Sequence, residues 1–263
     1  MTTIYKHEMK TCGKSLLIWF VCVGGMGLAC ILLFSGMRES MEGMAENFAA
    51  MGAFSDAFGM SRLSIATLSG FFAAEVGTIH ALGGSLFAAV LGAGMLSKEE
   101  DGHTGEFLFS LPVSRGRVTA AKWCAVVSDV LLFNLFCMGL YFAGIVAIKE
   151  EFPMKEFFFW HIMQVFLQLE LAAVCFAISA FMKRSKLGPG LGIVLFLYAY
   201  DLIARIVPEL SDYKALSPFS YANAADILSA GEVDKTAAAV GAIVLLAALG
   251  TAFKVYTGKD LAA

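Results

Sequence analysis

Six long apolar stretches dominate this chain and restrict what it can fold into. Apolar runs of about 18 or more residues are long enough to cross the hydrocarbon core of a bilayer as helices. The composition agrees, since 59% of the residues are hydrophobic, against roughly 45–50% in soluble domains. We predict an all-α polytopic membrane protein with a single transmembrane domain over residues 1–263. The predicted spans lie near residues 16–37, 71–96, 124–148, 157–182, 187–207 and 236–254.

The lysine and arginine residues predict which side of the membrane each connection faces. If both termini are cytoplasmic, 12 of the 19 basic residues fall in inner segments and seven in outer ones. Basic residues concentrate on the cytoplasmic side of membrane proteins, so we predict an N-in/C-in arrangement. This leaves one substantial cytoplasmic loop, 97–122, and two longer outer connections, 38–70 and 208–235. Both outer connections hold enough apolar residues to form interfacial or re-entrant helices.

The cytoplasmic loop is dense in charge for so apolar a chain, and it begins with the pattern of a helix start. Glu99, Glu100 and Asp101 are placed favourably against the positive end of a helix dipole. Asp101 or Thr104 can cap the helix. Ser114 can cap a second helix that leads back into the third span.

Between these two caps the loop carries a short apolar ridge. Phe107, Leu108 and Leu111 fall at i, i+1 and i+4 and therefore share one helical face. Pro112 ends the run because it has no amide hydrogen and clashes with the preceding turn. The pattern predicts an amphipathic helix that docks on something. The chain's own helix ends, lipid headgroups and a partner protein are the three alternatives.

The sequence of this loop is similar to a motif of a known protein family. The stretch EEDGHTGEFLFSLPVSR, residues 99–115, resembles the cytoplasmic loop of ABC exporter permeases of the type-2 class. Their typical form is Glu-Glu-Glu-x-Gly-Thr-x-Glu-x-Leu-Leu-Ser-x-Pro-[Ile/Val]-Ser-Arg with a lysine a few residues later, here Lys122. This chain departs from it by inserting His103 before the threonine, or equivalently by having Gly105 at a usually apolar position. Two weaker similarities are an amphipathic N-terminal segment at 4–19 and an outer segment at 216–231.

The resemblance implies the transmembrane permease subunit of an ATP-driven exporter, whose loop forms a coupling helix in a groove of a separate ATPase subunit. It implies two ATPase copies, which would bind ATP and Mg, and a second permease chain in a homodimer or heterodimer. The implied location is the cell membrane, as a multi-pass protein of a bacterial plasma membrane. The residues implied at the ATPase interface are Glu99, Glu100, Asp101, Thr104, Glu106, Phe107, Leu108, Leu111, Pro112 and Arg115.

Other sequence patterns bear on cofactors and enzyme activity. The chain has no GxxxxGK[ST] motif, which cradles phosphates in ATP-binding proteins, so ATP is expected only in the partner. It has no HExxH or GxSxG motif, and we do not expect an enzyme. The six cysteines form no CxxC pair and the four histidines are scattered, so no metal site is expected. A nucleic-acid partner is not expected either.

Polar residues in the fourth span are the remaining candidates, because ionisable groups at membrane depth are costly and tend to be functional or paired. On a helical wheel His161, Gln164 and Gln168 fall within about 60° of one another, in line with Cys175 and Ser179. We expect this side to face a pathway or a subunit interface. Glu170 points the opposite way, and we expect it to bond to another helix; a structural role is favoured over a substrate role. In the fifth span, Asp201 and Arg205 at i, i+4 are expected to pair.

Three other function classes compete with the permease. An ATP-independent secondary transporter would show an inverted repeat with interrupted helices; no repeat is evident, although Gly188-Pro189-Gly190 opens the fifth span unusually. An intramembrane enzyme would need a catalytic constellation, and a structural assembly factor would need none.

Overall fold

The computed structural model describes residues 2–52, 55, 62–105, 108 and 112–259. Secondary structure within these residues is helical, with no strand. The long α-helices are α1 (Thr2–Trp19), α2 (Gly25–Ala49), α5 (Gly77–Ala93), α8 (Arg115–Ile148), α9 (Met154–Phe181), α10 (Gly188–Ile206) and α12 (Lys235–Gly258). Shorter elements are the π-helical turns η1 (Phe20–Gly24) and η2 (Phe72–Val76), the 3-10 helix η3 (Pro208–Leu216), and α4 (Leu68–Phe71), α6 (Lys98–Asp101) and α11 (Ala224–Ala230).

Six helical units are long and apolar enough to cross a membrane, which confirms the predicted number of spans. They are Thr2–Ala45, Leu68–Ala93, Arg115–Ile148, Met154–Phe181, Gly188–Ile206 and Lys235–Gly258. The first and the third extend furthest beyond the apolar runs. The first continues from the N-terminal segment through η1 without a break, and the third begins at Arg115 rather than near residue 124. Residues 115–122 of the predicted loop therefore belong to α8.

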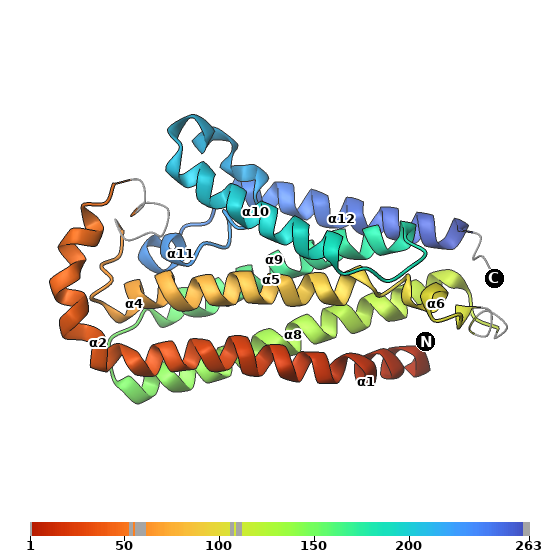
Figure 1. Ribbon diagram of the computed structural model, residues 1–263, viewed down its shortest axis with the longest axis horizontal. Helices are drawn as coiled ribbons and strands as arrows, with labels where there is room; N and C mark the ends of the chain where they lie inside the picture. The colour runs from red at the N-terminus through yellow and green to blue at the C-terminus, as the bar shows by residue number, and fades with distance from the viewer. Residues whose placement is uncertain (1, 53–54, 56–61, 106–107, 109–111, 260–263) are drawn as a thin grey trace.

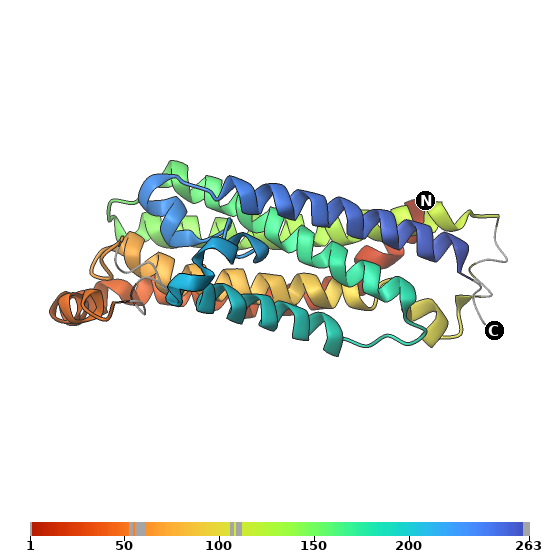
Figure 2. The same ribbon diagram turned by 90° about the horizontal axis from the view of Figure 1, so that it is seen from above.

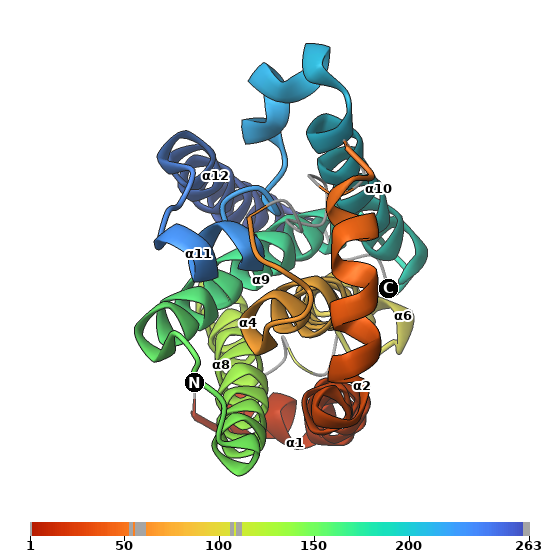
Figure 3. The same ribbon diagram turned by 90° about the vertical axis from the view of Figure 1, so that its left-hand side faces the viewer.

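The helices form an elongated bundle with both termini at one end (Figures 1 and 2). We call this the terminal end; it also carries α6. At the opposite end lie α4, α11 and the last turns of α2, which run across the bundle (Figures 1 and 3). The two connections predicted to be outer thus contain helices, as predicted, and four residues of α11 are buried: Ala224, Ala225, Ile227 and Leu228.

The second and fourth spans form the centre of the bundle. Seen from the opposite end, α5 and α9 lie in the middle, with α1, α8, α10 and α12 around them (Figure 3). In each of these two spans 61% of the most apolar 18-residue stretch is buried inside the protein, against 17–33% in the other four spans. The outer helices therefore leave most of their apolar surface for lipid or for another chain.

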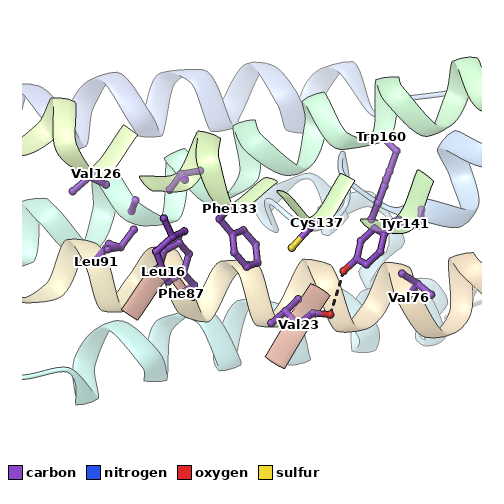
Figure 4. Close-up of a cluster of buried hydrophobic side chains, with 14 of the residues drawn as sticks. Leu16, Val23, Val76, Phe87, Leu91, Val126, Phe133, Cys137, Tyr141 and Trp160 are labelled. Carbon is purple, nitrogen blue, oxygen red and sulfur yellow. Dashed lines mark hydrogen bonds between the residues drawn. The ribbon is translucent and has the colours of Figure 1, made fainter. Parts of the chain in front are cut away.

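A small residue lets α5 and α9 approach closely. A Cβ added at Gly92 would lie 2.5 Å from the backbone oxygen of Ala172 on α9. Only glycine fits at such a separation. Around this contact Leu91, Phe87 and Phe133 belong to one apolar cluster, part of which is drawn in Figure 4.

The first span is joined to the core by a hydrogen bond to its backbone. Tyr141 Oη on α8 donates to the carbonyl oxygen of Val23 at 3.3 Å (Figure 4). Val23 lies in η1, where the π-helical turn interrupts the regular α-helical pattern. Gly27 makes room for the tyrosine, because a Cβ there would lie 2.5 Å from the Tyr141 ring.

Candidate functional site

The loop between α5 and α8 is attached to α9 at its beginning. The backbone amides of Leu96 and Ser97 both donate to Ser179 Oγ, at 2.9 and 3.0 Å. All three residues are buried. The two amides at the start of α6, where a helix leaves its first N–H groups without helical partners, therefore bond to one hydroxyl.

Glu99 in α6 is the centre of the loop's own structure. Its Oε1 lies 2.7 Å from Lys122 Nζ, and its Oε2 accepts a hydrogen bond of 2.6 Å from Thr104 Oγ1. The backbone amide of Thr104 also donates to the Glu99 carbonyl, at 2.9 Å. Burial alone would raise the pKa of Glu99, but the charge and hydrogen bond of Lys122, the Thr104 hydrogen bond and the charge of Lys98 together hold it below its usual value.

Lys122 joins this loop to the first span. Its ammonium lies 2.7 Å from Oε1 of Glu8 on α1, and the other oxygen of Glu8 contacts Lys98 Nζ. Lys122 is 0% exposed and Glu8 1%. Buried charges are stable only when they are paired and hydrogen-bonded. This group, Glu8, Lys98, Glu99 and Lys122, is named the ion cluster below.

The next two acids bind the loop to other helix ends. Glu100 Oε1 lies 2.7 Å from Nζ of Lys259, the residue after α12, and the same ammonium donates to the Met182 carbonyl at 2.8 Å. Arg115 donates to the carbonyl oxygen of Lys259. Asp101 accepts a hydrogen bond of 3.3 Å from the amide of Ser185, in the turn between α9 and α10.

The predicted ATPase-interface residues thus divide into two groups. Glu99 and Glu100 are partly buried in contacts within the chain, and Arg115 is half-buried. Asp101 and Thr104 also bond within the chain, at Ser185 and Glu99, but they are exposed, as is Pro112. Leu108, predicted on the docking ridge, is partly buried against the chain's own core. Glu106, Phe107 and Leu111 lie outside the described residues. That the exposed group meets an ATPase stays a prediction.

The loop backbone shows how the extra residue relative to the family pattern is accommodated. Gly102 follows α6, and His103 adopts a left-handed conformation with φ 52°. In this turn the His103 amide donates to the Glu100 carbonyl at 3.2 Å, and the Thr104 amide donates to the Glu99 carbonyl at 2.9 Å. Histidine is among the residues more often found in this region. The turn at His103 therefore keeps Glu99 and Thr104 in contact.

Inside the bundle, Gln168 belongs to a chain of buried polar groups on three spans. Asn134 on α8 donates to Gln168 Oε1 at 2.7 Å, and its own oxygen lies 3.0 Å from His80 Nε2 on α5. The other ring nitrogen of His80 lies 3.3 Å from Tyr141 Oη. In an environment without water, such groups must satisfy one another.

The other predicted intramembrane residues are also buried within this one chain. His161 Nδ1 bonds to the Phe157 carbonyl of its own helix at 3.0 Å, and Gln164 Nε2 donates to the Ala222 carbonyl at 2.8 Å. Glu170 Oε2 accepts a hydrogen bond of 2.8 Å from Tyr221. Gln164 and Glu170 thus bond to different residues, in agreement with the prediction that they lie on opposite faces of α9. The hydrogen-bond partner of Glu170 lies in the turn before α11, however, and not on another helix as predicted. That the stripe faces a pathway or a subunit interface stays a prediction.

The predicted pair in the fifth span is confirmed and extended. Arg205 Nε lies 2.8 Å from Asp201 Oδ2, and its Nη1 lies 3.4 Å from Asp226 Oδ2 on α11. Arg62 contacts the other oxygen of Asp226 at 2.9 Å. These alternating charges attach the short helix α11 to the end of α10.

Sequence reasoning missed the partners of the loop acids on α1 and after α12. Glu8 is the only acid in the first 16 residues, which also contain Lys6, Lys10 and Lys14. A lone acid in a basic segment was the available signal. For Lys259 there was no local signal, because its position beside Glu100 depends on how α12 packs.

Comparison with known families identifies one family that matches nearly the whole chain. The chain matches the family described as "ABC-2 family transporter protein" over residues 2–261. A comparison with curated proteins found no match. Because the family match covers nearly the whole chain, this multi-pass membrane protein belongs to the ABC-2 transporter family, the permeases of ABC transporters.

Proposed function

We propose that this chain is the permease subunit of an ATP-driven exporter and that its loop, residues 97–114, docks on a separate ATPase subunit. The observation that carries the proposal is the division within this loop. Its base is held by the ion cluster and by the Glu100–Lys259 pair, while Asp101, His103 and Pro112 are exposed. A loop that is firmly attached at its base and exposed at its tip is suited to transmit a push from a partner.

The ion cluster connects the loop directly to the spans, so that a movement of the loop would be transmitted to them. Lys122 is part of α8 and contacts Glu8 on α1, and Glu100 contacts the end of α12 through Lys259. Movement of the tip would therefore displace three spans together instead of bending the loop alone. A ligand shifts a protein between two states only by its different binding energy for each, and here the partner would supply that difference.

The remaining parts of the proposal concern the assembly. The ATPase would be present in two copies and would bind ATP and Mg. Two permease chains, identical or related, would form the path by alternating between inward- and outward-facing packings. The terminal end would face the cytoplasm, with both termini inside, in a bacterial plasma membrane. The loop acids would then lie on the same side as the ATPase.

Co-purification with the ATPase tests the docking. The double variant His103→Asp, Pro112→Asp adds two charges to the exposed part of the loop. Both side chains are exposed, and aspartate tolerates the left-handed conformation of His103, so the fold is expected to remain. We expect loss of the co-purified ATPase. Lys155→Asp changes an exposed residue in the first turn of α9, and α9 begins at the opposite end of the bundle. It is the matched control and should retain the ATPase.

Two results would contradict the proposal. One is a double variant that still assembles with the ATPase and still supports ATP-driven transport. The other is substrate transport by the purified chain without any ATPase, which would favour a secondary transporter.

A further inference from the structure

A pocket of about 190 Å³ lies at the terminal end, between α1, the end of α5 and the turn that precedes α10. Its polar lining residues are Thr11, Cys12, Ser15, Lys98 and Ser185. The predicted apolar spans begin near residue 16, end near residue 96 and begin again near residue 187. The pocket therefore lies at the level where apolar helix surface gives way to polar surface, which is the depth of lipid headgroups.

The pocket contains hydrogen-bond donors that the protein leaves unused. In the described part of the chain, the hydroxyls of Ser15 and Ser185 make no hydrogen bond to protein. The ammonium of Lys98 contacts Glu8 but has three N–H groups, so it can also donate into the pocket. Gly94 permits Ser185 to approach, because a Cβ there would lie 2.6 Å from Ser185 Oγ. Two hydroxyls and an ammonium form a set of donors suited to phosphate oxygens.

Further positive charge flanks the pocket on two sides. Lys14 is adjacent to Ser15 on α1, and Lys186 lies between the lining residues Ser185 and Leu187. Both lysines are exposed, and neither is in an ion pair with any described residue. The acids near the lining are Asp129, buried beside Cys12, and Asp101, which accepts a hydrogen bond from the Ser185 amide. Glu8 is already paired with two lysines. The positive charge available to an anion therefore comes from the two exposed lysines at the rim.

An apolar surface continues from the pocket into the depth of the membrane. On α1, Leu17 and Ile18 are 60% and 62% exposed. On the other side, Leu187 at the rim is 44% exposed and Leu195 on α10 is 50% exposed. A ligand with a phosphate at one end and hydrocarbon chains at the other matches both parts of this surface, whereas free phosphate matches only the first.

We propose that this pocket binds the phosphate headgroup of an anionic phospholipid whose acyl chains lie along the exposed apolar faces of α1 and α10. Basic pockets between membrane helices on the cytoplasmic side are known to hold such headgroups. The proposal does not depend on docking of an ATPase. A bound lipid would connect α1 to the turn before α10, two segments that meet at the pocket through the end of α5.

Native mass spectrometry of the full-length chain in a neutral detergent tests the proposal. The chain is titrated with phosphatidylglycerol, with phosphatidylcholine and with inorganic phosphate. We expect the first phosphatidylglycerol to bind at least tenfold more tightly than phosphatidylcholine, and inorganic phosphate not to displace it. Equal binding of the two lipids would overturn the anionic site, and displacement by phosphate at similar concentrations would overturn the lipid assignment.

Variants place the binding in this pocket. The double variant Lys14→Ala, Lys186→Ala is expected to weaken phosphatidylglycerol binding at least tenfold, since each lysine near the membrane surface contributes roughly a fivefold factor. Ser15→Ala, Ser185→Ala should weaken it severalfold without changing charge. The control Lys254→Ala removes an exposed lysine at the same end on α12 and should have no effect. An equal loss in the control, or no loss in either double variant, would overturn the site.

Discussion

The ammonium of Lys122 lies 2.7 Å from Oε1 of Glu8, although the two residues are 114 positions apart and both side chains are almost completely buried. This contact joins the first span to the beginning of the third. Because Lys122 also contacts Glu99 at 2.7 Å, the same ammonium joins both spans to the loop. The arrangement explains why a loop that is polar in sequence is structurally part of the bundle.

Removing the negative charge of Glu8 should destabilise the protein. Glu8→Gln leaves Lys98 without its contact and Lys122 with Glu99 alone. A hydrogen bond to a charged group contributes about 2 kcal/mol, and we expect a loss of this order in thermal unfolding in detergent. Glu42→Gln is the matched control, because Glu42 pairs with Arg38 on an exposed helix face; its effect should be below about 0.5 kcal/mol. Equal effects would refute the buried role of Glu8.

Removing Lys122 should cost more than removing Glu8. Lys122→Met leaves the carboxylates of Glu8 and Glu99 facing each other in a buried site. The loss of one partner from a buried ion pair typically costs about 3–5 kcal/mol. Adding Glu8→Gln and Glu99→Gln to this variant should restore part of the stability, because no buried carboxylate is then left unpaired and the Lys98 side chain, 29% exposed, can reach water. If the triple variant unfolds at a lower temperature than Lys122→Met alone, this electrostatic explanation is wrong.

Acid should weaken the ion cluster through Glu99. The ordinary pKa of this group is 4.5, and the neighbours of Glu99 lower it in the folded protein. The folded state therefore binds the proton less tightly than the unfolded state, and the stabilisation is complete above about pH 4.5 and is lost as the pH falls through the lower folded value. The stability difference between the native protein and Glu99→Gln, measured by thermal unfolding, should shrink below that pH. A difference that grows on acidification would contradict the assigned contacts.

A single methyl group between α5 and α9 should be poorly tolerated. Gly92→Ala would place a Cβ 2.5 Å from the Ala172 oxygen, and overpacking of this kind costs about 1–3 kcal/mol. Gly139→Ala is the matched control on α8, where a Cβ meets nothing within 4 Å; it should be neutral or stabilising, since alanine favours helices. Thermal unfolding of the two variants in the same detergent would measure the difference. Equal stability of the two would show that the helices do not pack this closely.

The sequence was sufficient to predict the number of spans but not their full lengths. A span requires only a long apolar run, and each of the six runs forms a helix. The helices extend beyond the runs where they leave the lipid, as α1 does around Lys6 and Lys10 and α8 does around Arg117. A hydropathy pattern marks the part of a helix that contacts lipid, and it does not show how far the helix continues into water.

For the candidate site, the sequence located the charged loop but did not predict what its residues contact. Glu99 and Glu100 were predicted at a partner's surface, yet their described contacts lie within the chain, at Lys122 and Lys259. The partner of Glu170 was equally hidden, because Tyr221 lies 51 positions away in a turn. Such contacts depend on how whole helices pack and leave no periodic pattern in the sequence. The pair Asp201–Arg205 was predictable because i, i+4 spacing alone brings the two together.

Cross-linking in native membranes tests the central claim most directly. A cysteine is introduced at Pro112, on the exposed part of the loop, or at Lys155, exposed in the first turn of α9. A bifunctional cross-linker is then applied, and the products are identified by mass spectrometry. The account predicts that Pro112→Cys cross-links to an ATP-binding subunit and that Lys155→Cys does not. An ATP-binding subunit cross-linked from Lys155→Cys and never from Pro112→Cys, in membranes that retain transport, would contradict it.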